Sequence, residues 1–169
     1  MASGTERSGT GEWGNVSLRP MVEDDLGPVL AIERALFPED AWTEGMFRNE
    51  LAGRSSRHYL VAEEDGKVVG YAGLFAHRRA ADVQTIAVRS GLWGRGVGTT
   101  LLAALLEEAE RRGCGEVYLD VRADNDRAQR LYQRFGFERI GVRRGYYEQA
   151  GVDAVVMRRT RASGSEKRG

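Results

Sequence analysis

The sequence contains few of the residues from which disulfides and metal sites are built. Its 169 residues include a single cysteine, Cys114, and two histidines, His58 and His77. One thiol cannot form an internal disulfide, and so few soft ligands argue against a structural zinc site. Cys114 follows an apolar helical pattern and precedes a strand pattern, which favours a small buried residue at a turn over an activated nucleophile. We therefore expect no metal in the functional site.

The sequence also has no long hydrophobic run and no excess of either charge. No stretch approaches the roughly 20 apolar residues that span a bilayer, and residues 1–14 do not read as a signal peptide. Twenty-five basic residues balance 25 acidic ones, so the overall charge indicates neither a nucleic-acid nor a membrane partner. We predict a cytoplasmic protein with one domain at residues 15–160 and flexible tails at 1–14 and 161–169.

Hydrophobic periodicity predicts an α/β protein of the mixed, α+β kind. Alternating or short apolar runs predict seven strands: 16–20, 58–62, 68–75, 83–88, 116–121, 137–142 and 152–157. Helical spacing predicts four helices: 22–37, 43–51, 97–112 and 126–134. Asp65-Gly66 is typical of a hairpin turn. This order of elements predicts a mixed sheet with helices on both faces.

A glycine-rich loop, Gly94-Arg95-Gly96-Val97-Gly98-Thr99, joins a predicted strand to a predicted helix. The first N–H groups of a helix lack intrahelical partners and lie at the positive end of its dipole. Glycines let a phosphate approach these amides, which makes the loop a candidate anion site. The first helical turn carries no acidic residue, and Arg95 offers an additional cation.

Two other phosphate-binding motifs fit this loop poorly. A nucleoside-triphosphate loop ends in Gly-Lys-Ser/Thr, and this loop contains no lysine. A dinucleotide fingerprint needs a further glycine where Thr99 and Leu101 stand, and it opens a parallel unit rather than following antiparallel strands. A purely structural turn remains an alternative.

A second group of candidate residues follows the strand at 116–121. Strand alternation turns Asp120 away from the core residues Leu119 and Val121, toward the strand end where open sheets place ligands. Tyr132 lies on the next helix, which Asn125 begins. Each has a purely structural alternative: an edge carboxylate for Asp120, a core aromatic for Tyr132, and an N-cap for Asn125.

Taken together, these motifs resemble the GNAT superfamily of acetyl-CoA-dependent acetyltransferases, and within it the bacterial ribosomal-protein-alanine N-acetyltransferase family. The resemblance extends from Val16 to Arg158. It rests on these segments: Ala35-Leu-Phe-Pro, Ala41-Trp-Thr-Glu with Phe47, Ile86-Ala-Val, the glycine loop, Leu119-Asp-Val-Arg-Ala-Asp-Asn125, Leu131-Tyr132, Phe135-Gly-Phe137 and Arg143-Arg-Gly-Tyr-Tyr147. The fold that it implies is a seven-stranded, mostly antiparallel sheet, splayed at the acetyl-CoA site, with about four helices on its two faces.

The resemblance also implies a role for each matching residue. The loop amides from Gly94 to Thr99 would bind the CoA pyrophosphate, and Asn125 would bind the pantetheine arm. The backbone of Ile86, Ala87 and Val88 would hold that arm like an added strand. Tyr132 would protonate the departing thiolate, and Asp120 stands where the family has a glutamate base. Trp42, Tyr146 and Tyr147 would line the acceptor cleft.

Two residues depart from the family pattern, and the acceptor stays open. Trp93 replaces the usual Gln or Arg before the loop, and Asp120 is one methylene shorter than glutamate. The implied partners are CoA and the N-terminus of a ribosomal protein or another peptide. A small-molecule amine acetyltransferase and a non-catalytic acyl-CoA-binding module are the alternatives. An acidic group, Glu39, Asp40, Glu44 and Glu50, is a further hypothesis for attracting a basic acceptor peptide, against an ordinary solvated face.

Overall fold

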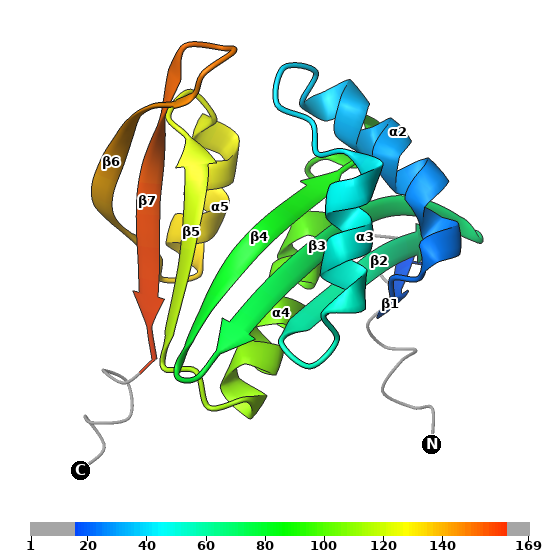
Figure 1. Cartoon of the computed structure of the whole chain (residues 1–169), viewed down its shortest axis with the longest axis horizontal. Coiled ribbons are helices and arrows are strands. Elements are labelled where there is room, and N and C mark those ends of the chain that lie inside the picture. The colour runs from blue at the N-terminus through cyan, green and yellow to red at the C-terminus, as the bar shows by residue number, and fades with distance from the viewer. Residues whose placement is uncertain (1–15, 162–169) are drawn as a thin grey trace.

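The structure, a computed structural model, describes residues 16–161, and its centre is a sheet with the strand order β1-β2-β3-β4-β5-β7-β6 (Figure 1). The seven strands of the described chain are β1 Val16–Pro20, β2 Arg57–Glu64, β3 Lys67–His77, β4 Ala80–Val88, β5 Glu116–Arg122, β6 Glu138–Tyr147 and β7 Val152–Thr160. Only β4 and β5 run parallel; every other neighbouring pair is antiparallel. The predicted mixed sheet is therefore confirmed, while the predicted tails, apart from Arg161, lie outside the described residues.

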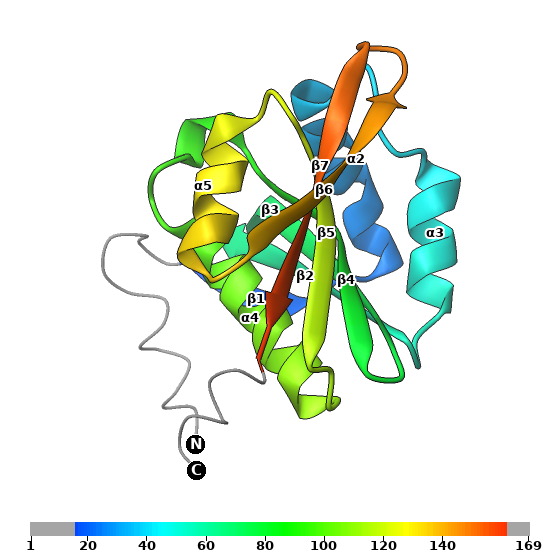
Figure 2. The same ribbon diagram turned by 90° about the vertical axis from the view of Figure 1, so that its left-hand side faces the viewer.

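Four α-helices of the described chain cover the sheet, two on each face (Figure 2). They are α2 Leu26–Leu36, α3 Glu44–Ala52, α4 Val97–Arg111 and α5 Asp126–Arg134, with short 3₁₀ turns at η2 Glu23–Asp25 and η3 Ser90–Leu92. Thr43 begins α3 by accepting a hydrogen bond from the Met46 amide at 3.2 Å. Gly113 follows α4 with a φ of +80°, the conformation expected after a helix end. Among residues 16–161, no helix combines the length and apolar character needed to cross a membrane.

The central strand β3 separates two hydrophobic cores. Tyr71 packs with α2 and α3 on one face, whereas Ala72 and Leu74 face α4 on the other. This division follows from strand alternation, which sends successive side chains to opposite faces. Cys114 is 2% exposed and belongs to the α4 side, so the predicted buried position is confirmed. Burial also raises the pKa of its thiol, which disfavours the nucleophilic thiolate.

The sheet opens between β4 and β5. The two strands pair only from Ala80 to Asp82 against Glu116 to Tyr118, and Figure 1 shows them separating beyond that point. A β-bulge lies just past this ladder, because β3 residues Gly73 and Leu74 pair with Thr85 and Val83, which leaves Gln84 as the extra residue. Bulges bend the strand that carries them. The splayed sheet implied by the resemblance is thus present, and the bulge gives a physical cause for it.

Several strands are longer than the sequence pattern predicted. β6 extends five residues beyond the predicted end at Val142. Nearly every residue of this strand is exposed or half-buried, so it lacks the alternation that marks a strand in sequence. β4 begins at Ala80, three residues before the predicted start.

Candidate active site

A continuous groove runs through the opening between β4 and β5. Its larger part, about 870 Å³, lies between β4, the start of α4 and α5. Its smaller part, about 160 Å³, lies between β4, β5 and the segment after α2. The two parts meet at six residues that line both: Phe37, Ile86, Arg122, Asn125, Ala128 and Tyr132. We call the larger part the donor pocket and the smaller part the acceptor pocket, after the roles that the resemblance implies for their residues.

The start of α4 forms the anion-binding end of the donor pocket. Gly94 and Gly96 have φ values of +82° and +87°, which are left-handed conformations that favour glycine. Gly96 begins the helix without a side-chain cap, and the first turn of Val97–Arg111 holds no acidic residue. The amides of Val97, Gly98 and Thr99 therefore have no intrahelical acceptors, and all three residues line the pocket.

Three arginines of α5, rather than the loop arginine, bring positive charge to the donor pocket. Arg127, Arg130 and Arg134 recur on one side of this helix and line the pocket together. Arg95, which was expected to contribute, instead pairs with Glu64 at 3.5 Å and is absent from the residues that line the pocket. Burial and the neighbouring Arg130 lower the pKa of Arg127, as expected for a desolvated cation next to another cation. Three clustered guanidiniums and free helix amides suit a polyphosphate ligand.

Trp93 ties the loop to both walls of the donor pocket. Its indole N–H donates to the Val88 carbonyl at 2.8 Å, which fixes the loop to the end of β4. The Arg127 guanidinium lies 4.0 Å from the centre of its ring, within the range of a cation–π contact. The departure from the family pattern at this position thus has a structural role.

Asn125 is an N-cap, as predicted. Its side-chain oxygen accepts a hydrogen bond from the Ala128 amide at 3.0 Å, and its side chain also lines both pockets. An Asn amide has two N–H donors besides its oxygen, so the cap and a ligand contact are compatible. Ile86, Ala87 and Val88 line the opposite wall along β4.

Tyr132 lies at the junction of the two pockets. It is 6% exposed, and its ring packs edge-on against Phe137 at 5.8 Å. Burial, and secondarily the neighbouring Tyr147, raises the pKa of Tyr132 well above its usual value. The hydroxyl therefore stays protonated near neutral pH and can donate a proton at the junction.

Asp120 projects from β5 into the acceptor pocket. Arg143 of β6 donates to its carboxylate at 3.3 Å, a contact between two predicted motifs that sequence alone does not show. Asp82, at the narrow end of the opening, has its pKa raised by burial and then by the charge of Asp120. A carboxylate that lines the pocket, as Asp120 does, can accept a proton from an amine or from a bound water.

Trp42 and Tyr147 line the acceptor pocket, whereas Tyr146 does not. Tyr146 is 51% exposed and packs edge-on against Tyr147 at 5.1 Å, so it supports the wall from outside. Burial, together with the negative charge of Asp120, raises the pKa of Tyr147 to about 12. Trp42 rests against Phe47, with 5.0 Å between ring centres.

Glu33 is a residue of the acceptor pocket that sequence reasoning missed. Its side chain is only 2% exposed and accepts hydrogen bonds from the Tyr71 hydroxyl and from the Trp42 amide. Burial raises the pKa of Glu33. Its neighbours in sequence give an ordinary amphipathic helix pattern, so only the α2–sheet packing identifies it as part of the site.

The acidic residues proposed to attract a basic acceptor do not form one free patch. Glu44 pairs with Arg48 at 2.7 Å, and Glu50 pairs with Arg57 at 3.0 Å. Glu39 and Asp40 lie elsewhere, beside the groove, where both face one arginine. That hypothesis is therefore not supported. Within the described chain, no three His, Cys, Asp or Glu side chains group in a way that could hold a metal ion.

Comparison with known proteins agrees with this geometry. Residues 28–137 match the model of the acetyltransferase (GNAT) family. The chain is 42% identical over 149 residues to the N-alpha-acetyltransferase RimI of Mycobacterium tuberculosis, covering 85% of this chain and 92% of that protein. It is 34% identical over 141 residues to a putative ribosomal protein bS18-alanine N-acetyltransferase of Bacillus subtilis, covering 83% and 93%.

A solved structure gives the same result at the level of the fold. The crystal structure of the ribosomal-protein-S18-alanine N-acetyltransferase from Escherichia coli superposes with a TM-score of 0.76 at 28% identity, covering 86% of this chain and 93% of that one. The glycine loop, the splayed strands and these similarities lead to one conclusion: the chain belongs to the GNAT family of acetyltransferases and is related to the RimI-type N-acetyltransferases.

Proposed function

We propose that this protein transfers an acetyl group from acetyl-CoA to the N-terminal α-amine of a protein, with the N-terminal alanine of a small-subunit ribosomal protein as its acceptor. The observation that carries the proposal is the junction of the two pockets at Tyr132. A thioester delivered through the donor pocket and an amine entering the acceptor pocket would meet there. The names of the relatives in M. tuberculosis and B. subtilis support this acceptor class. Such an acceptor places the enzyme in the cytoplasm, where ribosomal proteins are made.

The donor pocket fits CoA by its chemistry. The free amides at the start of α4 and the arginines of α5 would bind the phosphates. Asn125 and the backbone of Ile86 to Val88 would hold the pantetheine arm along the open edge of β4. This arrangement would direct the thioester toward Tyr132, because all of these groups line one pocket.

The proposed chemistry is a direct transfer. The neutral amine attacks the thioester carbonyl carbon, a C–N bond forms, and the C–S bond breaks. Asp120 takes the amine proton through a water, and Tyr132 donates its proton to the departing sulfur. A backbone N–H near Val88 would stabilise the oxyanion. An α-amine has a pKa of roughly 7.7–8.0, against about 10.4 for lysine, so the α-amine loses its proton more readily near neutral pH.

Replacement of Tyr132 by phenylalanine tests the proposal. The variant keeps the packing against Phe137 but removes the proton donor, so kcat should fall about 10²- to 10⁴-fold with little change in CoA affinity. Thiol release, measured with acetyl-CoA and an alanine-initiated ribosomal peptide, provides the assay. Tyr118→Phe is the matched control, because that hydroxyl binds Glu116 outside the groove. Normal turnover by Tyr132→Phe would remove Tyr132 from the chemistry.

The same assay separates the alternatives. Turnover with small amines but with no peptide would indicate a small-molecule acetyltransferase. Tight CoA binding without turnover on any amine would indicate a binding module. Lysine-containing peptides with blocked N-termini test whether the α-amine is required.

A further inference from the structure

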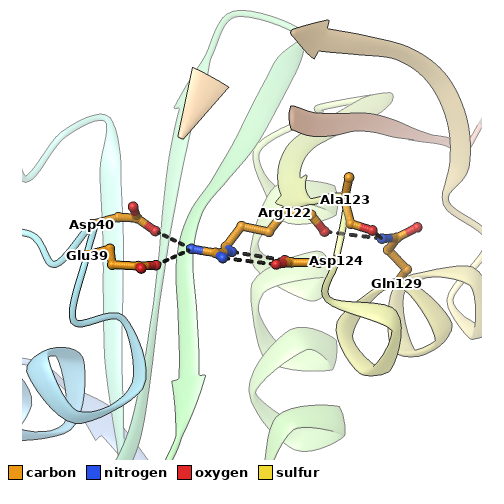
Figure 3. A network of polar contacts seen from close by, with 6 residues as sticks. All are labelled: Glu39, Asp40, Arg122, Ala123, Asp124 and Gln129. Carbon is orange, nitrogen blue, oxygen red and sulfur yellow. Dashed lines mark hydrogen bonds and ion pairs between the residues drawn. The ribbon is translucent and has the colours of Figure 1, made fainter. Parts of the chain in front are cut away.

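Arg122 connects the two sides of the groove. It is the last residue of β5, and its guanidinium reaches Asp40 at 2.9 Å and Glu39 at 3.4 Å, in the segment between α2 and α3 (Figure 3). The same guanidinium makes two 3.0 Å contacts with Asp124, ahead of α5. The Gln129 side chain donates to the Arg122 carbonyl at 3.2 Å, which holds the backbone of this residue in place.

These contacts cross the opening at its wide end. β4 and β5 pair only near Asp82, so their far ends are not joined by backbone hydrogen bonds. Glu39 and Asp40 belong to the part of the chain that packs on β2, β3 and β4, whereas Arg122 belongs to β5. Arg122 also lines both pockets. The ion pair therefore spans the groove at the boundary between donor and acceptor.

Of the two carboxylates across the groove, Asp40 is the partner of Arg122 that is better shielded from water. The side chains of Arg122 and Asp40 are 22% and 19% exposed, whereas Glu39 is 52% exposed. Exposed ion pairs contribute little, but hydrogen-bonded pairs that are shielded from water are costly to break. The segment at 37–43 has a second attachment on its other side, where the Trp42 amide donates to Glu33 at 2.9 Å. Phe37, Asp40 and Trp42 of this segment line the acceptor pocket.

We propose that Arg122 is a positioning residue: its ion pair with Asp40 holds the 37–43 segment against the end of β5 and so sets the width of the acceptor opening. This inference rests on the proposed function, because it assigns one wall of the acceptor pocket for that reaction. Without the pair, the segment keeps its contacts on the other side, namely the Trp42 amide bond to Glu33 and the packing of Trp42 on Phe47, but loses its tie to β5. The acceptor amine then binds less often in line with the thioester, even though the reacting groups are intact.

The test compares the whole chain with four single variants and one double variant. Arg122→Gln should lower kcat/KM for an alanine-initiated peptide about 10- to 100-fold, mainly through a higher KM for the peptide, as expected when a wall shifts by about 1 Å. The dissociation constant for CoA should change far less. Arg122→Lys should recover part of the loss, because an ammonium can still reach Asp40 but cannot form the forked contact with Asp124 as well. Arg48→Gln is the control: Arg48 also contacts two carboxylates, Glu23 and Glu44, but on the outer surface.

A double-mutant cycle with Asp40→Asn identifies the partner. If the pair acts as a unit, Arg122→Gln combined with Asp40→Asn should be no worse than Arg122→Gln alone. Additive losses would overturn the proposal, and so would a normal peptide KM in Arg122→Gln.

Hydrogen exchange separates this inference from the proposed function. The amides of residues 37–43 should exchange faster in Arg122→Gln and at the wild-type rate in Arg48→Gln. This readout needs no turnover. If the wild type acetylates no peptide, the proposed function fails, while the exchange result still decides whether the ion pair holds the segment. Unchanged exchange in Arg122→Gln would by itself refute the proposal that this ion pair holds the 37–43 segment.

Discussion

The buried carboxyl group of Glu33 leads to a prediction about stability that can be worked out from its contacts. Glu33→Ala removes the acceptor for the Tyr71 hydroxyl and for the Trp42 amide. Each buried donor left without a partner costs about 1–3 kcal/mol, so the loss should be about 2–6 kcal/mol. For a chain of this size, 1 kcal/mol corresponds to a shift of about 2–4 °C in Tm. Glu33→Ala should therefore melt about 4–24 °C below the wild type.

Glu33→Gln should behave differently, because its oxygen can accept from the Trp42 amide and its NH2 can donate to the Tyr71 hydroxyl, while the charge is removed. Burial raises the folded-state pKa of Glu33 above its unfolded value, so the folded state binds more protons over the pH range between the two. Wild-type stability should then fall as pH rises through that range and remain lower above it. Glu33→Gln lacks this loss, so its stability relative to the wild type should increase from low to neutral pH.

Urea denaturation of the three proteins at several pH values between about 4 and 8 measures both effects. The midpoint and the slope should be recorded at each pH, because only a shift in midpoint at constant slope reports stability. If Glu33→Gln were destabilised by the same amount at every pH, the buried carboxyl would carry no unfavourable ionisation, and the reasoning would be refuted. If Glu33→Ala matched the wild type, the two hydrogen bonds would contribute nothing.

Two further predictions concern packing and CoA binding. Gly73→Ala should lower Tm, because the added carbon would overlap the Tyr59 ring and overpacking costs about 1–3 kcal/mol. Gly27→Ala is the control, since nothing lies within 4 Å of its added carbon. Equal melting of the two variants would contradict the close contact between Gly73 and the Tyr59 ring. Arg130→Gln should weaken CoA binding about tenfold at low salt and less at high salt. Titration calorimetry alongside Arg95→Gln measures this, and an equal loss in both variants would show that the loop arginine binds CoA as strongly as α5 does.

Much of the fold could be predicted from the sequence, because most elements have one buried face. Alternation marked the central strands, and Thr43, Gly113 and Asn125 marked helix ends through their local chemistry. β6 was predicted too short since it lies at the edge of the sheet and is exposed along most of its length. The bulge at Gln84 could not be predicted, because it depends on how β3 and β4 pair and not on any local signal.

The site was predictable only where a motif is continuous in sequence. The glycine loop begins α4 and Tyr132 lies on α5, as the sequence predicted, while their roles in the reaction stay predictions. The arginines of α5 recur at helical spacing, so the sequence does contain a pattern that places them on one side of the helix. Glu33 and Arg122 make their contacts with residues far away in the chain, Tyr71 and Asp40. Such contacts are decided by how α2 and β5 are placed relative to the rest of the sheet, which no local pattern in the sequence records.

The three-residue parallel ladder between β4 and β5 also has a practical consequence. Few backbone hydrogen bonds fix the angle between the two parts of the sheet, so a coenzyme that touches both β4 and α5 would add cross-links that the bare chain does not possess. Ligands that bind only the folded state raise its melting temperature, and the rise grows with the ratio of ligand concentration to dissociation constant. Thermal shift can therefore report coenzyme loading in a catalytically inactive variant, which separates a failure to load from a failure to react.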